Sequence, residues 1–198
     1  MATRKLELTG IAEWAKVFTQ NRDLTGYKPV PSAEGSYEKY NGACTLNIII
    51  DDANLAAMQA SGCPKQPKAD PEGRGWIVKF DRKFDTGQDY ASGPPTVTHS
   101  DGSAWDFVDD GLIGNGSTID ISVTVYDIPK YGKVGSRLDT VVVTDHVMVE
   151  GAAPEIFSAR TVNRLDKEII AQVSLPKNTA AAVSSPPADG KLDDEIMF

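Results

Sequence analysis

The stretch STIDISVTVYD, residues 117–127, is the clearest β-strand in the sequence. Its apolar and polar side chains alternate strictly, and this two-residue period predicts a strand with one face on a core. The pair Asn115-Gly116 just before it suits a tight turn with positive φ. The stretch therefore predicts a half-buried strand that follows a sharp turn. Its apolar face carries Ile119, Ile121, Val123 and Val125.

Four other segments have a strand pattern. They are residues 11–18 (IAEWAKVF), 43–50 (ACTLNIII), 75–84 (GWIVKFDRKF) and 137–149 (RLDTVVVTDHVMV). Segment 11–18 fits a strand or a helix, and the alternation of Trp14, Lys16 and Phe18 favours a strand. In segment 75–84, one predicted face carries Trp76, Val78, Phe80 and Phe84, and the other carries Lys79, Asp81 and Lys83.

Two segments have helical features. Residues 51–62, DDANLAAMQASG, predict a helix that Asp51 or Asp52 caps and that Gly62 and Pro64 end. The spacing of apolar residues predicts a second helix at 161–173. Five strands, one or two short helices and long loops fit a mainly β chain that forms a five-stranded barrel. We assign residues 1–175 to this domain.

The composition changes at Pro176. Residues 176–191, PKNTAAAVSSPPADGK, are small, polar and rich in proline, which predicts a flexible linker within a tail of residues 176–198. The end of the tail combines acids with large apolar side chains, a pattern suited to a basic, partly apolar surface on a partner protein. The predicted partner-binding residues are Asp193, Asp194, Glu195, Ile196, Met197 and Phe198.

The chain as a whole is acidic, with 198 residues, a net charge of −8 and 40% hydrophobic residues. Nucleic-acid binding would therefore need local basic patches rather than bulk charge. No long apolar run is present and the start, MATRKLELTG, lacks the apolar segment of a secretory signal, so we expect a soluble intracellular protein with no membrane contact. Cys44 and Cys63 predict reduced thiols rather than a disulfide or metal site, and we expect no cofactor.

Residues 126–137, YDIPKYGKVGSR, interleave aromatic rings with cations. An unpaired base can stack on a ring while a nearby cation neutralises its phosphate, so the pattern predicts a single-stranded nucleic-acid site. A hairpin tip with ordinary solvated charges is an equal alternative. The candidate residues are Tyr126, Lys130, Tyr131, Lys133 and Arg137.

The connection after the first strand has the same pattern, and the third strand adds cations. Five-stranded oligonucleotide-binding barrels use the loops after strand one and before strand five, with the face between them. In the alternative, the tyrosines of the first loop pack on the barrel rim. The candidate residues are Tyr27, Lys28, Tyr37, Lys39, Tyr40, Arg74, Lys79, Arg82 and Lys83.

Signals for catalysis are weak. Residues 101–110, DGSAWDFVDD, cluster four aspartates without the spacing of a calcium loop or a two-metal nuclease. Residues 111–117, GLIGNGS, lack the Lys-Ser/Thr of a phosphate loop. His99 and His146 have no nucleophile pattern beside them. We predict no enzymatic activity, and a metal-dependent nuclease is the weakest alternative.

The succession GACTLNIIIDD, GWIVKFDRKF, GLIGNGSTIDISVTVYD and SRLDTVVVTDHV resembles the single-stranded DNA-binding proteins of tailed bacteriophages over roughly residues 10–150. The acidic end resembles that of bacterial single-stranded DNA-binding proteins, although Met197 stands where that pattern usually has proline. The resemblance implies an OB-fold, sequence-tolerant binding of single-stranded DNA, no catalysis, and roles in DNA replication, recombination and repair.

The resemblance also implies that the protein acts in the cytoplasm of an infected bacterial host. Replication proteins, such as a polymerase, a helicase/primase or a nuclease, would bind the tail, and a homodimer is compatible with the pattern. The alternative interpretation is a structural or decoration β-domain of a virion, which would have no affinity for nucleic acid.

Overall fold

A computed structural model describes residues 3–149 of the chain. The predicted helix at 161–173, the domain boundary at 175 and the tail with its partner-binding residues 193–198 lie outside the described residues. Five long strands account for the predicted barrel. They are β1 (Thr3–Lys16), β2 (Ala43–Ile50), β4 (Trp76–Lys83), β6 (Thr118–Ile128) and β7 (Lys133–Asp145).

Shorter elements decorate these strands. Two brief strands extend the sheet, β3 (Lys68–Ala69) and β5 (Thr96–His99), and the prediction of five strands missed both. Within residues 3–149, one α-helix, α1 (Asp52–Ala60), follows β2. Three 3-10 turns lie in the connections of the same described part: η1 (Glu38–Tyr40), η2 (Asp89–Ala91) and η3 (Pro129–Tyr131).

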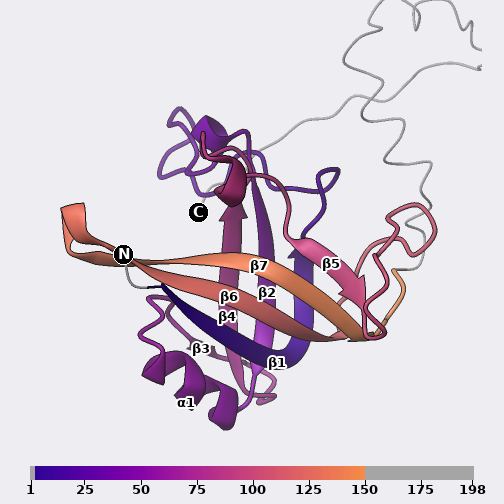
Figure 1. The fold of residues 1–198 in the computed structure, drawn as a ribbon. Helices are drawn as coiled ribbons and strands as arrows, with labels where there is room; N and C mark the ends of the chain where they lie inside the picture. The colour runs from indigo at the N-terminus through magenta and orange to yellow at the C-terminus, as the bar shows by residue number, and fades with distance from the viewer. Residues whose placement is uncertain (1–2, 150–198) are drawn as a thin grey trace, which may run out of the picture. The chain divides into compact units, whose positions relative to one another are not determined.

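Strand β1 lies at the centre of the sheet, whose order is β3-β4-β2-β1-β6-β7-β5 (Figure 1). Its first part pairs antiparallel with β6 and its last part with β2, so the strand is shared by both halves of the sheet. The sheet closes where β4 meets β7: Arg82 Nη1 donates to the Leu138 carbonyl at 3.4 Å and to Asp139 Oδ1 at 3.1 Å. A five-stranded Greek-key barrel with this pairing is an OB-fold.

The core confirms the predicted alternation. In β6, Ile119, Ile121, Val123 and Val125 are buried, while the intervening residues are partly exposed. In β4, Val78 and Phe80 are fully buried, with Trp76 packed against them. Strand β2 departs from the half-buried pattern, because every residue except Asn47 is buried.

The predicted turn and helix cap are also present. Gly116 has φ +94°, and its N–H donates to the Ala12 carbonyl at 2.9 Å, so the turn is fastened to β1. Asp51 caps α1, since its carboxylate accepts from the Asn54 N–H at 2.8 Å. These two features fix how the chain enters β6 and leaves β2.

Strand β1 begins at Thr3, well before the predicted start at residue 11. Leu6 and Leu8 are buried in its first part, but charged neighbours at Arg4, Lys5 and Glu7 hide that short alternation in the sequence.

Candidate nucleic-acid interface

The loop of residues 17–42 brings two predicted tyrosines onto the outer face of β4. Lys79 Nζ lies 5.8 Å from the centre of the Tyr37 ring. Lys83 Nζ lies 4.3 Å from the centre of the Tyr40 ring and donates to its hydroxyl at 3.3 Å. Lys39 Nζ lies 5.0 Å from the centre of the Tyr40 ring. We call Tyr37, Lys39, Tyr40, Lys79 and Lys83 the loop–strand cluster.

Local geometry explains how this cluster forms. The two-residue period of β4 directs Lys79 and Lys83 outward, because the alternate residues Val78 and Phe80, on either side of Lys79, face the core. The loop returns to β2 through Asn41 and Gly42, whose φ values are +55° and +99°. The tight return leaves both tyrosines beside the strand rather than in solvent.

The two tyrosine hydroxyls have opposite environments. Burial, with Asp81 and Asp23 nearby, raises the pKa of Tyr37 to about 12. Burial also acts to raise the pKa of Tyr40, but hydrogen bonds from Lys83 and Lys39 outweigh it, and that pKa lies below its ordinary value. Burial thus dominates at Tyr37, whereas the two lysines dominate at Tyr40, and ammonium groups lie beside both rings.

The β6–β7 hairpin supplies a second group of predicted residues. Among residues 3–149, β6 and β7 pair with no other strand beyond Thr3↔Tyr126, so the tip projects as a two-stranded ribbon (Figure 1). Tyr131 on this tip is 65% exposed, and Lys130 Nζ lies 5.4 Å from its ring centre. Lys133 is also exposed. A ring with free faces and adjacent cations suits base stacking.

Tyr126 has a structural position instead. Its ring covers Gly135 on the paired strand, where a Cβ atom would lie 2.5 Å from the ring. Because Gly135 has no side chain, the Tyr126 ring can pack directly against the hairpin backbone. Tyr27, in contrast, is 76% exposed in the loop of residues 17–42 and has a ring open to solvent.

Several predicted cations are held by carboxylates. Lys28 pairs with Glu38 within its own loop. Arg74 contacts Glu13 at 2.7 Å, Asp70 at 2.9 Å and Glu72 at 3.2 Å, and the hydrogen bonds to Asp70 and Glu13 raise its pKa. It precedes β4 at the end opposite to Lys83. We leave Arg74 out of the interface.

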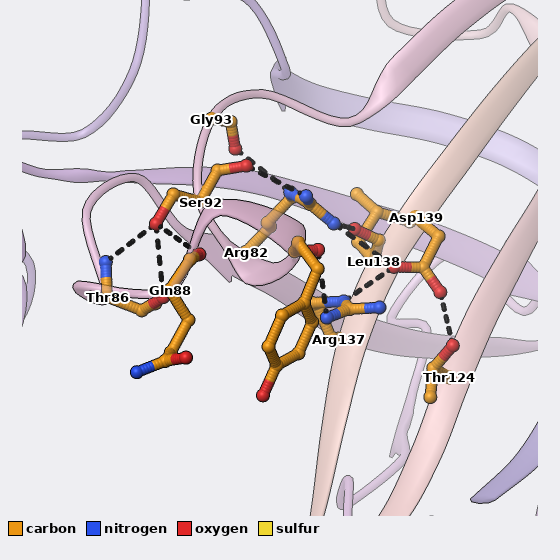
Figure 2. A network of polar contacts seen from close by, with 10 residues as sticks. Arg82, Thr86, Gln88, Ser92, Gly93, Thr124, Arg137, Leu138 and Asp139 are labelled. Carbon is orange, nitrogen blue, oxygen red and sulfur yellow. Dashed lines mark hydrogen bonds and ion pairs between the residues drawn. The ribbon is translucent and has the colours of Figure 1, made fainter.

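Arg82 lies on the inward-facing side of β4, and its residue is 9% exposed. In addition to its hydrogen bonds with Leu138 and Asp139 on β7, its guanidinium donates to the carbonyls of Gly93 and Ser92, both at 2.9 Å (Figure 2). The guanidinium thereby joins β4, β7 and the loop of residues 84–95. The structure corrects the sequence-based assignment, because Arg82 shares the register of Val78 and Phe80 and its donors are occupied.

The Asp139 carboxylate accepts hydrogen bonds from two arginines where β4 meets β7. It accepts from Arg82 and also from Arg137 Nε at 2.6 Å, and Thr124 donates to its second oxygen (Figure 2). Arg137 also donates to the Tyr90 carbonyl at 3.3 Å and lies 5.9 Å from the centre of that ring. Tyr90 is 75% exposed, so the structure adds a ring–cation pair that sequence reasoning missed.

The free positive charge on the interface comes from lysines. Among residues 3–149, no ion pair forms at Lys39, Lys79, Lys83, Lys130 or Lys133. Their ammonium groups carry charge that neighbouring carboxylates have not neutralised. Phosphates attract such charges, and the aromatic rings stand beside most of them.

The aspartates of residues 101–110 fasten their own loop. Asp101 accepts from the Ser103 N–H at 2.9 Å, and Asp106 accepts from the Val108 N–H at 2.7 Å. Asp110 lies 2.9 Å from His99 Nε2. Within residues 3–149, no group of three or more His, Cys, Asp or Glu is placed to hold a metal ion.

Cys44 is buried in the sheet, and burial raises the pKa of its thiol to about 12. Cys63 is partly buried, and both thiols are free. In the part of the chain that the structure describes, no helix combines the length and apolar character that a bilayer crossing requires.

Comparisons with known proteins give matches among solved structures. No protein-family model matches the chain, and a comparison with curated proteins finds no match. The chain is similar to the single-stranded DNA-binding protein from bacteriophage Enc34 in complex with ssDNA, at 11% identity and a TM-score of 0.45, over 75% of this chain and 89% of that chain. It is also similar to gp2.5, a single-stranded DNA-binding protein encoded by bacteriophage T7, at 14% identity and a TM-score of 0.43, over 76% of this chain and 96% of that one. The fold assignment itself rests on the strand pairing described above.

Proposed function

We propose that the chain binds single-stranded DNA without strong sequence preference and without catalysis. The observation that carries this proposal is the loop–strand cluster, in which two tyrosine rings lie beside three lysines that form no ion pair among residues 3–149. Lysines that contact phosphates give affinity for any sequence, and stacking on rings requires bases that are not already paired. The exposed hairpin residues Lys130, Tyr131 and Lys133 extend the same chemistry.

The test is a titration of fluorescently labelled oligo-dT, followed by anisotropy at several salt concentrations. We expect binding that weakens linearly in a plot of log affinity against log salt, and that exceeds binding to a duplex of equal length. Undetectable binding at low salt, or equal affinity for the duplex, would reject the proposal. A virion β-domain would give the first of these results.

We further propose that the acidic residues 193–198 recruit partner proteins during replication, recombination or repair of phage DNA in the host cytoplasm. The support is the sequence itself, which joins three acids to Ile196, Met197 and Phe198. An anionic peptide tethered near a cationic surface also competes with DNA for it. Deleting residues 190–198 should tighten oligo-dT binding and abolish pull-down of a replication partner such as a polymerase. Unchanged or weaker DNA affinity would show that the peptide does not compete.

A further inference from the structure

Trp14 occupies a backbone conformation that usually belongs to glycine. It lies on β1 at a β-bulge, between the paired residues Glu13 and Lys16, and its φ is +51°. Bulges of this kind favour glycine because a side chain is strained in the left-handed region. A tryptophan here is a backbone outlier, and such outliers concentrate at functional sites.

The indole is exposed, unlike the other two tryptophans of the chain. Trp14 is 67% exposed, whereas Trp105 is 9% exposed and Trp76 donates its indole N–H to Asp52 at 2.8 Å. Ala12 on the same strand and Val17 just after it are buried, and Ala15 packs against the core. These apolar side chains around the bulge face the core, whereas the indole of Trp14 does not.

The loop before β6 holds the bulge in place. The Trp14 N–H donates to Asn115 Oδ1 at 2.7 Å, and the Gly116 N–H donates to the Ala12 carbonyl at 2.9 Å. These bonds satisfy backbone groups of β1 beyond Ile11↔Thr118, the last pair of the β1–β6 ladder. The indole is thus presented from a fixed backbone.

The bulge lies on the same run of strands as the loop–strand cluster. Glu13 pairs with Asn47 on β2, and Asn47 pairs with Lys79 on β4. Two strand spacings separate β1 from β4, which places the bulge about 10 Å from Lys79. Lys16 and Lys79 both lie close enough to Asp23 to act electrostatically on its carboxylate, so a cation beside the bulge and one of the cluster share this neighbour.

We infer that Trp14 is a stacking platform for an unpaired nucleobase, at the β1 end of the surface that carries the loop–strand cluster. This inference rests on the proposed function and adds a residue that ring–cation patterns in the loops did not indicate. An indole has the largest ring face of any side chain, and stacking is tolerant of base identity. Lys16, two residues along and exposed, is placed to neutralise the adjacent phosphate.

The experiment compares Trp14→Asn, Trp14→Phe and the matched control Trp76→Phe with the wild-type chain. Asparagine tolerates positive φ, so Trp14→Asn removes the ring without adding backbone strain. We expect oligo-dT affinity to fall about 5- to 100-fold in Trp14→Asn, to recover partly in Trp14→Phe, and to stay unchanged in Trp76→Phe. The thermal midpoint of Trp14→Asn should equal or exceed that of the wild type.

Tryptophan fluorescence gives a direct readout of the same contact. Oligo-dT should quench the wild-type emission and protect it from acrylamide, and both effects should disappear in Trp14→Asn. If the wild type binds oligo-dT but Trp14→Asn binds equally well with the fluorescence response unchanged, the stacking role is refuted and the proposed function stands. If the wild type does not bind, the proposed function fails first. Acrylamide protection that depends on protein concentration without DNA would instead assign Trp14 to a protein contact and overturn the inference.

Discussion

Neutralising Lys79 and Lys83 together tests the electrostatic part of the interface. Five lysines there have no carboxylate partner in the described residues: Lys39, Lys79, Lys83, Lys130 and Lys133. If each neutralises one phosphate, log affinity should fall with log salt at a slope of about −3.5, since each contact with a single strand contributes about −0.7. The double variant Lys79→Gln/Lys83→Gln should then give about −2.1.

The change is large enough to measure by anisotropy with oligo-dT. Between about 50 and 200 mM salt, wild-type affinity should fall on the order of 100-fold and that of the double variant about 20-fold. Glutamine keeps a polar side chain that can still contact the Tyr40 hydroxyl, so the loop retains its support. A control is Lys5→Gln, because Lys5 pairs with Glu7 at 2.8 Å on the part of β1 that faces β6. An unchanged slope in the double variant, or an equal drop in the control, would refute the reasoning.

Three other variants separate binding from folding. Tyr131→Ala should weaken oligo-dT binding by about 1–3 kcal/mol and leave the urea midpoint unchanged, because the ring is 65% exposed; an unchanged affinity would remove the hairpin tip from the interface. Arg82→Met should lower the free energy of unfolding by about 3 kcal/mol in urea titrations, because it leaves buried acceptors at the barrel seam unpaired, while the folded fraction binds DNA normally. Hydrogen bonds from Arg74 lower the pKa of Asp70 below 3.8, so its stabilisation is present above that pH and is lost as pH falls through the folded pKa. Asp70→Asn should therefore be less stable than wild type at pH 7, and the difference in unfolding free energy should shrink in acid; a constant difference would contradict the linkage.

The sequence was sufficient for the strands whose alternation is uninterrupted. Segment 117–127 predicted β6 and its buried face, and Asn115-Gly116 predicted the turn before it. The same alternation, continued two residues beyond Phe80, would have placed Arg82 on the inward face, since it shares the register of Val78 and Phe80. Its polar character suggested a surface position, but the barrel seam offers carbonyls and a carboxylate in place of water.

Other site features depend on contacts that no local pattern encodes. Arg74 and Lys28 look as free in the sequence as Lys79 does, and only the fold shows that carboxylates hold the first two. Trp14 fits the alternation of a buried strand, and the bulge that turns it outward depends on pairing with β2 and on Asn115, about a hundred residues away. Ring–cation spacing therefore indicated a candidate region, and the fold shows which of its cations already have carboxylate partners.

The shared carboxylate of Asp139 has a consequence for how the barrel responds to a ligand. Arg82 and Arg137 both donate to one oxygen, and Thr124 donates to the other. A phosphate that drew Arg137 away would leave the carboxylate with Arg82 and Thr124 as donors, so its charge would remain compensated and β4 would remain joined to β7. Arg137 can thus exchange partners while the seam keeps its own hydrogen bonds. Arg137 is the more exposed of the two arginines, and its loss from the network would destabilise the barrel less than the loss of Arg82.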